Sequence, residues 1–121
     1  MPRFAILRHD SLRGVHWDLL LEAGGMLRTW ALEQEPAAGA AIACRALPDH
    51  RLLYLDYEGP VSGERGTVAR WDRGTYEAES ESADELTVQL AGERLYGRAS
   101  LTREPGESGA WRFLLYSSRS A

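Results

Sequence analysis

Apolar and polar positions alternate with a period of two along most of this chain. Successive side chains of a strand point to opposite faces of a sheet, so this alternation predicts strands rather than helices. The segments that show it are residues 3–9, 15–22, 26–32, 51–57, 67–72, 75–80, 85–91, 94–102 and 110–118. Together they predict about eight short antiparallel strands joined by tight turns.

Turn residues separate the predicted strands. Gly24 and Gly25 indicate a hairpin, and Asp72-Arg73-Gly74 indicates a tight turn between residues 67–72 and 75–80. The alanine-rich segment 36–47 is the one plausible helix, although Gly39 weakens it. Short strands at this spacing are typical of barrels and sandwiches. We expect an all-β fold with a minor helix, a compact antiparallel β-barrel of about eight strands, in a single domain spanning residues 1–121.

The composition is that of a folded domain outside the membrane. Apolar residues make up 44% of the 121 residues, charged residues 26% and aromatic residues 9%, which is ordinary for a globular protein. No apolar run approaches the roughly 20 residues that span a bilayer, and the start of the chain is too short in its apolar part for a signal peptide. The single cysteine, Cys44, excludes an internal disulfide. We therefore expect a cytoplasmic protein.

Net charge limits the size of any nucleic-acid-binding surface. The chain carries a net charge of −4, from 18 acidic and 14 basic residues, and every basic residue is an arginine. An acidic total argues against a broad positive groove for nucleic acid. The planar guanidinium of arginine nevertheless suits a small site that grips a single phosphate.

Two of the three histidines lie within the ten residues HDSLRGVHWD, each close to an aspartate. On the predicted strand 15–22, His16 and Asp18 share one face, about 6–7 Å apart along the backbone. His9 closes the preceding strand, and the segment between is long enough to return the chain beside His16. Such a set of nitrogen and oxygen ligands, with positions left open, is typical of a catalytic metal site. Structural histidines that are solvated or hydrogen-bonded are the alternative.

The third histidine, His50, precedes Tyr54 in the segment PDHRLLYLDYEG. If residues 51–57 form a strand, His50 and Tyr54 share a face, and the pair is suited to holding an anion or moving a proton. Cys44 and the four tryptophans fit core positions better than a reactive thiol or base-stacking platforms. A phosphate-binding loop at Gly63 and Gly66 is only weakly indicated.

Taken in order, the motifs resemble a known family. They are His9, HWDLLLE, a Gly-Gly pair, LRTWAL, PDHRLLYLDYEG, GTVARWDRGTYE, LAGERLYGRASLTR and WRFLLY. This series resembles the 3′-phosphoesterase domain of bacterial DNA ligase D over nearly the whole chain, and DYEG, GTV and WDRGTYE are its most specific part. The resemblance implies a compact β-barrel and a manganese-dependent enzyme that removes a 3′-terminal ribonucleoside, and then a 3′-phosphate, from primer ends.

The resemblance also implies roles for five residues. His9, His16 and Asp18 match the family's metal-binding residues, and His50 and Tyr54 match its catalytic histidine and tyrosine. The implied cofactor is a divalent metal, Mn²⁺. The implied substrate is the 3′ end of DNA or of a DNA–RNA primer on its template, with DNA repair ligase or polymerase proteins as partners and no membrane.

Three positions depart from the family's pattern. Leu20, Gln34 and Ile42 stand where the family has basic residues, and Leu20 lies on the predicted strand of His16 and Asp18. Losing these charges weakens the electrostatic stabilisation on which phosphoryl transfer depends. The cations that would replace them are among Arg8, Arg13, Arg45 and Arg51.

Three functional hypotheses follow. The first is a phosphoesterase that acts on nucleic-acid 3′ ends. The second is a phosphate- or end-binding module that kept the metal and lost turnover. The third is a non-haem iron enzyme whose facial triad would consist of His16, Asp18 and the distant His50.

Overall fold

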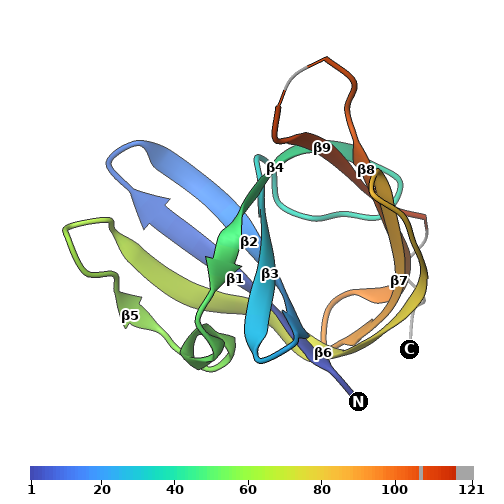
Figure 1. The fold of residues 1–121 in the computed structure, drawn as a ribbon. Coiled ribbons are helices and arrows are strands. Elements are labelled where there is room, and N and C mark those ends of the chain that lie inside the picture. The colour runs from blue at the N-terminus through green and yellow to red at the C-terminus, as the bar shows by residue number, and fades with distance from the viewer. Residues whose placement is uncertain (107, 117–121) are drawn as a thin grey trace.

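The computed structural model describes residues 1–106 and 108–116, which form nine strands and one short 3-10 helix (Figure 1). Their bounds are β1 Arg3–Ser11, β2 Gly14–Ala23, β3 Met26–Leu32, β4 Ala41–His50, η1 Leu52–Leu55, β5 Gly59–Pro60, β6 Thr67–Glu81, β7 Glu85–Gly92, β8 Tyr96–Arg103 and β9 Ala110–Leu115. The all-β prediction is confirmed. Of the predicted strand 110–118, residues 117 and 118 lie outside the described part of the chain.

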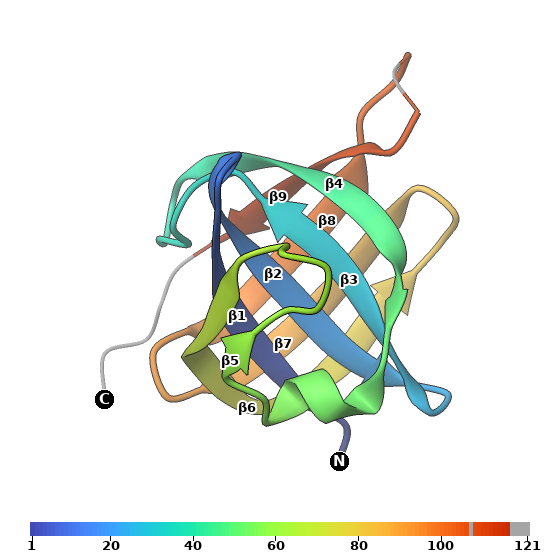
Figure 2. The same cartoon turned by 90° about the vertical axis from the view of Figure 1, so that its left-hand side faces the viewer.

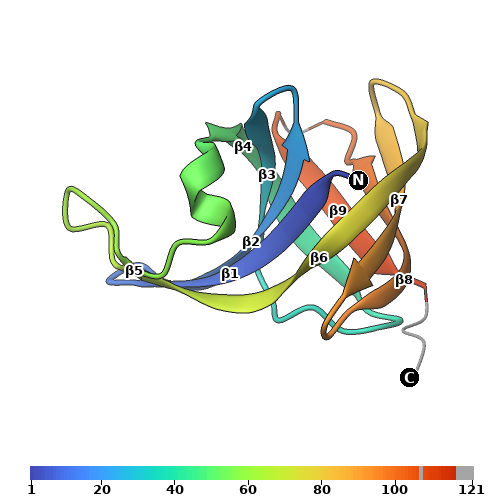
Figure 3. The same ribbon diagram turned by 90° about the horizontal axis from the view of Figure 1, so that it is seen from below.

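Eight of the strands form a hydrogen-bonded ring. Neighbours pair in the order β1-β2-β3-β4-β9-β8-β7-β6, and β6 pairs in turn with β1 (Figure 1). All of these pairs are antiparallel, as expected. The short β5 pairs with the first residues of β6. Figure 3 shows β5 and η1 at the same end of β1 and β6, outside the ring.

The β1–β2 hairpin is covered on both faces. Phe4 and Leu19 belong to the main core inside the ring, whereas Leu7 and Leu20 belong to a smaller cluster on the other face. This outer cluster consists of Ala5, Leu7, Leu20, Leu27, Leu55 and Val68. A strand buried on both faces has no polar side to alternate with, which is why the sequence runs FAIL in β1 and LLL in β2.

The alanine-rich segment 36–47 is not a helix, and that prediction is wrong. Its second half belongs to β4, which pairs with β3 and β9. Ile42 and Cys44 are buried while Ala41 and Ala43 are exposed, so the segment follows a period of two. Strand pairing and burial override the helix propensity of alanine here.

The predicted strand 51–57 is also wrong. Leu52–Leu55 form the 3-10 helix η1, which buries Leu55 in the outer cluster. His50, Leu52, Tyr54 and Asp56 therefore do not share the face of a strand. The preceding β4 already has a partner on each edge, and the helical turn covers the outer face of the hairpin.

The predicted turn at Asp72-Arg73-Gly74 is absent, because β6 runs through it without interruption. The Asp72 side chain is buried and accepts hydrogen bonds from the backbone N–H groups of Arg73, Arg94 and Leu95, at 2.8, 2.9 and 2.9 Å. The aspartate thus stabilises the β7–β8 connection rather than a turn of its own.

The single cysteine and the tryptophans are core residues, as expected. Cys44 is buried, and burial raises the pKa of its thiol to about 12, which keeps it protonated and unreactive. Trp30 and Trp111 pack edge to face with ring centroids 5.8 Å apart, and Trp17 and Trp71 pack against the same core. Among the described residues, no helix has the length and apolar character needed to cross a membrane.

Gly66 packs the β5–β6 loop against β1. Its φ is +93°, and a Cβ at this position would collide with the backbone carbonyl of Asp10. We expect Gly66→Ala to lower the free energy of unfolding by about 2–4 kcal/mol, because the backbone strain at a positive φ and the steric collision with Asp10 both destabilise the folded state. Gly63→Ala is the matched control, since Gly63 also has a positive φ (+76°) but no close neighbour, and should cost about 1 kcal/mol. Equal losses in urea denaturation would contradict this packing.

Candidate functional site

The β1–β2 hairpin brings the three predicted metal ligands together. His9 of β1 lies directly opposite His16 of β2 in the antiparallel register, and their ring centroids are 4.7 Å apart. Asp18 follows His16 by two residues and therefore lies on the same face of β2. This is the face that carries the outer cluster.

The carboxylate of Asp18 contacts both imidazoles. Its Oδ1 is 3.0 Å from Nε2 of His16, and its Oδ2 is 3.5 Å from Nδ1 of His9. One ligand atom from each residue lies within 4.8 Å of the others. Across residues 1–106 and 108–116, no other group of histidine, cysteine and carboxylate side chains meets this distance, and His50 is not a member of the group.

Electrostatics favours an ionised Asp18. Burial by itself raises the pKa of this carboxyl, but the polar contacts with His16 and His9 outweigh burial and hold the pKa below its usual value. The contact with Asp18 likewise raises the pKa of His9, against the opposing effect of partial burial. A proton in the cluster thus compensates the buried carboxylate. A divalent cation can take the place of that proton, because metal ligands bind in their deprotonated form.

The backbone carbonyl of Arg65 orients the His9 ring. Nε2 of His9 lies 2.6 Å from this oxygen, and because a carbonyl only accepts hydrogen bonds, Nε2 carries the proton. Once Nδ1 has lost its proton, its lone pair faces the side of Asp18. Metal-binding histidines usually donate their second ring N–H in this way, which fixes the tautomer. The β5–β6 loop therefore holds His9 in the orientation that a metal ligand needs.

The donor atoms fit a divalent metal. Asp18 Oδ1 is buried, and no donor within the described residues gives it a hydrogen bond of good geometry, although His16 Nε2 is close. A buried carboxylate oxygen without such a partner is costly unless a cation binds to it. Two imidazole nitrogens and one carboxylate form a suitable ligand set and leave coordination positions open for water or substrate.

A cleft of about 450 Å³ opens beside the cluster and contains the second predicted pair. His9, Asp18, His50 and Tyr54 all line it, and His16 adjoins it through its contact with Asp18. The walls come from β1, β2, the end of β4, η1 and the β5–β6 loop, which face the viewer in Figure 2. The structure thus brings all five predicted site residues together, although they come from two separate stretches of the sequence.

His50 and Tyr54 meet through the geometry of η1 and not through that of a strand. Their ring centroids are 5.9 Å apart at an interplanar angle of 68°, and Tyr54 also packs edge to face with Tyr57. Nδ1 of His50 lies 3.0 Å from the carbonyl of Pro48, so Nδ1 donates this hydrogen bond and Nε2 remains for a ligand. An imidazole and a phenol side by side can bind an anion and transfer a proton to it.

The three positions with lost basic residues lie outside the cleft. Leu20 is 0% exposed in the outer cluster, and Ile42 is 1% exposed in the main core. Gln34 is exposed in the connection between β3 and β4. In this chain, two of the three positions are therefore packed among apolar side chains and offer no place for a charge.

Arginines reach the cleft from other positions. Of the four candidates named from the sequence, Arg51 lines the cleft, whereas Arg8, Arg13 and Arg45 are not among its lining residues. Arg65 also lines the cleft, and sequence reasoning missed it. The sequence signal that could have identified it is the glycine-rich segment SGERG. This segment places Arg65 on a loop between two glycines, both of which have a positive φ.

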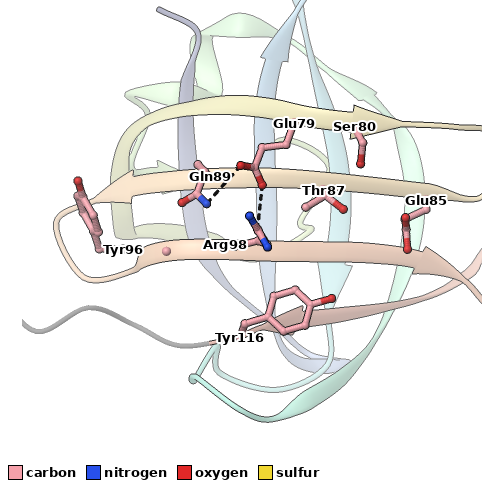
Figure 4. Close-up of a pocket in the computed structure, with 9 residues that line it drawn as sticks. Glu79, Ser80, Glu85, Thr87, Gln89, Tyr96, Arg98 and Tyr116 are labelled. Atoms are coloured by element: carbon pink, nitrogen blue, oxygen red, sulfur yellow. Dashed lines mark hydrogen bonds and ion pairs between the residues drawn. The ribbon is translucent and has the colours of Figure 1, made fainter.

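A larger hollow, of about 760 Å³, lies on the outer face of β6, β7 and β8. Figure 4 shows Glu79 in contact with Arg98 and Gln89, at 2.9 and 3.5 Å. These three polar side chains therefore pair with one another, and the described residues that line the hollow include no histidine or cysteine. Size alone does not identify the site, and the candidate metal ligands lie at the smaller cleft.

The chain is similar to known proteins over most of its length. A family model described as the DNA Ligase D 3′-phosphoesterase domain matches residues 7–103. The chain is 33% identical over 121 residues to the "Multifunctional non-homologous end joining protein LigD" of Pseudomonas aeruginosa, covering 90% of this chain and 14% of the relative. It is 36% identical over 113 residues to the "Multifunctional non-homologous end joining DNA repair protein LigD" of Mycobacterium tuberculosis, covering 86% of this chain and 15% of the relative. The chain thus spans about one seventh of the length of these relatives.

Proposed function

The chain belongs to the DNA ligase D 3′-phosphoesterase domain family, and we propose that it is a divalent-metal-dependent phosphoesterase acting on nucleic-acid 3′ ends. One observation carries the proposal. The group of His9, His16 and Asp18, with its buried carboxylate oxygen lacking a good hydrogen bond, borders the same cleft as His50 and Tyr54.

In this proposal His9 Nδ1, His16 Nε2 and the Asp18 carboxylate hold the metal, with Mn²⁺ as the proposed ion. When bound, a divalent metal polarises a phosphoryl oxygen and lowers the pKa of bound water. In its doubly protonated form, His50 donates from Nε2 to the phosphoryl group of a 3′-phosphate or gives that proton to the leaving 3′ oxygen. Water adds to phosphorus and one of its protons passes to a phosphate oxygen, while the bond from phosphorus to the 3′ oxygen breaks. The 3′ oxygen, protonated by His50, becomes a hydroxyl. Tyr54 donates its O–H to a phosphate oxygen.

A binding module that retains the metal without turnover is the second candidate. The observation in its favour is that the basic residues expected at Leu20, Gln34 and Ile42 are absent, so that part of the charge stabilisation for phosphoryl transfer is lost. Such a module would retain a 3′-phosphorylated end and release no product.

The iron hypothesis changes in the light of the geometry. The third member of the group is His9, not His50, and its donor types are still those of a facial triad. Membership of a phosphoesterase family favours hydrolysis. Formation of succinate from 2-oxoglutarate, Fe²⁺ and oxygen would reverse this preference.

A primer with one 3′-terminal ribonucleotide tests the enzyme against the module. On this labelled primer, annealed to its template, the wild type should produce shortened ends with Mn²⁺. His50→Ala should reduce the rate by about 100-fold or more, because general acid catalysis contributes about that much. Product length is measured on a denaturing gel.

Calorimetric titration with Mn²⁺ is the control for this variant, since His50 lies outside the ligand group and His50→Ala should bind the metal as the wild type does. Wild-type protein that retains the primer on a filter but never shortens it would establish the binding module instead.

A further inference from the structure

We propose that Arg51 and Arg65 bind the substrate's terminal phosphate, in place of the cation that Leu20 no longer supplies. The inference rests on the proposed function and names the residues that recognise the phosphate. Leu20 is apolar and buried outside the cleft, whereas two arginines line the cleft from different segments of the chain.

The side chain of Arg65 is held in place by its own loop. Its Nε donates to the carbonyl of Ser62 at 2.7 Å, and its Nη2 donates to the Ser62 hydroxyl at 3.1 Å. Nη1 has no hydrogen-bond partner among the described residues. The backbone carbonyl of Arg65 holds His9, so one residue orients a metal ligand and presents a guanidinium beside it. A guanidinium that is already oriented loses less entropy when it binds a phosphate.

Arg51 lines the cleft from a different segment of the chain. It lies between β4 and η1, directly after His50, and its carbonyl accepts a hydrogen bond from the Tyr54 N–H at 3.1 Å. The side chain is exposed, and within residues 1–106 and 108–116 no carboxylate or other group pairs with it. The backbone of Arg51 is thus held while its cation remains available for a ligand.

The charges of the cleft match a phosphate when the metal is present. Two carboxylates, Asp18 and Asp49, and two guanidiniums, Arg51 and Arg65, line the cleft, and their charges cancel when the histidines are neutral. A divalent cation on Asp18 brings the total to about +2, which complements the charge of about −2 on a phosphate monoester. The arginines and the metal would therefore act together, and a 3′-hydroxyl end would gain little from either arginine.

Binding of two otherwise identical primers tests this inference. One primer ends in a 3′-phosphate and the other in a 3′-hydroxyl, and dissociation constants are measured with His50→Ala as the background so that the phosphate is not removed. In that background, Arg51→Gln and Arg65→Gln should each weaken binding of the 3′-phosphate primer about 10-fold in Mn²⁺, and together about 100-fold. Binding of the 3′-hydroxyl primer should change less than about 2-fold.

Two controls separate the possible causes of a loss. Arg98→Gln removes the same charge from the far face of the ring, where Arg98 pairs with Glu79, and should leave both affinities unchanged. Calorimetric titration with Mn²⁺ should give wild-type affinity for Arg65→Gln, because His9 is held by a backbone carbonyl that the substitution retains.

The outcomes distinguish this inference from the proposed function. A parent protein that prefers the 3′-phosphate, and whose preference survives in the double variant, would overturn the role of the two arginines and leave the phosphoesterase intact. A parent protein without any preference for the phosphate would overturn both. Loss of the preference in the double variant alone, with Mn²⁺ binding retained, is the result that the inference expects.

Discussion

Asp18→Ala should abolish metal binding and, with it, turnover. The carboxylate is the one anionic ligand of the group, and it lies between the two histidines. Without it, two neutral imidazoles would have to hold the divalent ion with no negative charge to balance it. We expect the affinity for Mn²⁺ to fall by at least about 100-fold. Phosphoesterase turnover should fall by about 1000-fold or more, because a divalent ion contributes several kcal/mol to the transition state. Calorimetry measures the first effect and primer dephosphorylation the second.

Asp10→Asn is the matched control for Asp18→Ala. Asp10 belongs to the same hairpin, next to His9, but it is exposed and pairs with Arg8 at 3.4 Å. Removing its charge should change the affinity for Mn²⁺ less than about 2-fold. Circular dichroism of each variant shows whether it is folded. A folded Asp18→Ala protein with wild-type Mn²⁺ binding would rule out this site.

Leu20→Arg should lower the free energy of unfolding and should not raise the activity. The side chain is 0% exposed and packs in the outer cluster with Leu7, Leu27 and Leu55. A guanidinium there would be buried without a partner, which costs about 3–5 kcal/mol. The free energy of unfolding, measured in urea, should fall by this amount, and the folded fraction should show no gain in turnover.

Two variants on the same strand control for the substitution at Leu20. Leu20→Met keeps the volume and polarity and should cost less than about 1.5 kcal/mol. Val15→Arg places the new charge where the side chain is 37% exposed, and its effect should stay within about 0.5 kcal/mol. A Leu20→Arg protein as stable as the wild type and more active would mean that this position faces the cleft and that its positive charge is missing.

Much of the fold could be predicted because most of the ring strands outside the β1–β2 hairpin show one polar and one apolar side. The exceptions have physical causes. Residues 41–47 resemble a helix by composition, since alanine favours helices, but pairing with β3 and β9 determines their structure. Asp72 looked like a turn residue because aspartate caps turns, and it does so here for a turn distant in sequence. Neither tertiary pairing is visible in local sequence.

Most residues of the candidate site could be predicted from the sequence, but only part of their spatial arrangement could be. His9 and His16 could be placed opposite each other because a short connection between two strands sets their register. His50 and Tyr54 were expected together for the wrong reason, since they meet across η1. Arg65 was missed because its place beside His9 depends on how the β5–β6 loop folds back onto β1, a contact across 56 residues of sequence.

Release of inorganic phosphate from a duplex primer with a 3′-phosphate, measured while Mn²⁺ is titrated, tests the proposed function most directly. We predict that wild-type protein releases phosphate as the metal site fills, leaves a 3′-hydroxyl primer, and stops when a chelator removes the metal. Protein that binds Mn²⁺ and retains the primer, but releases no phosphate at any Mn²⁺ concentration, would contradict the proposal that this site is a phosphoesterase.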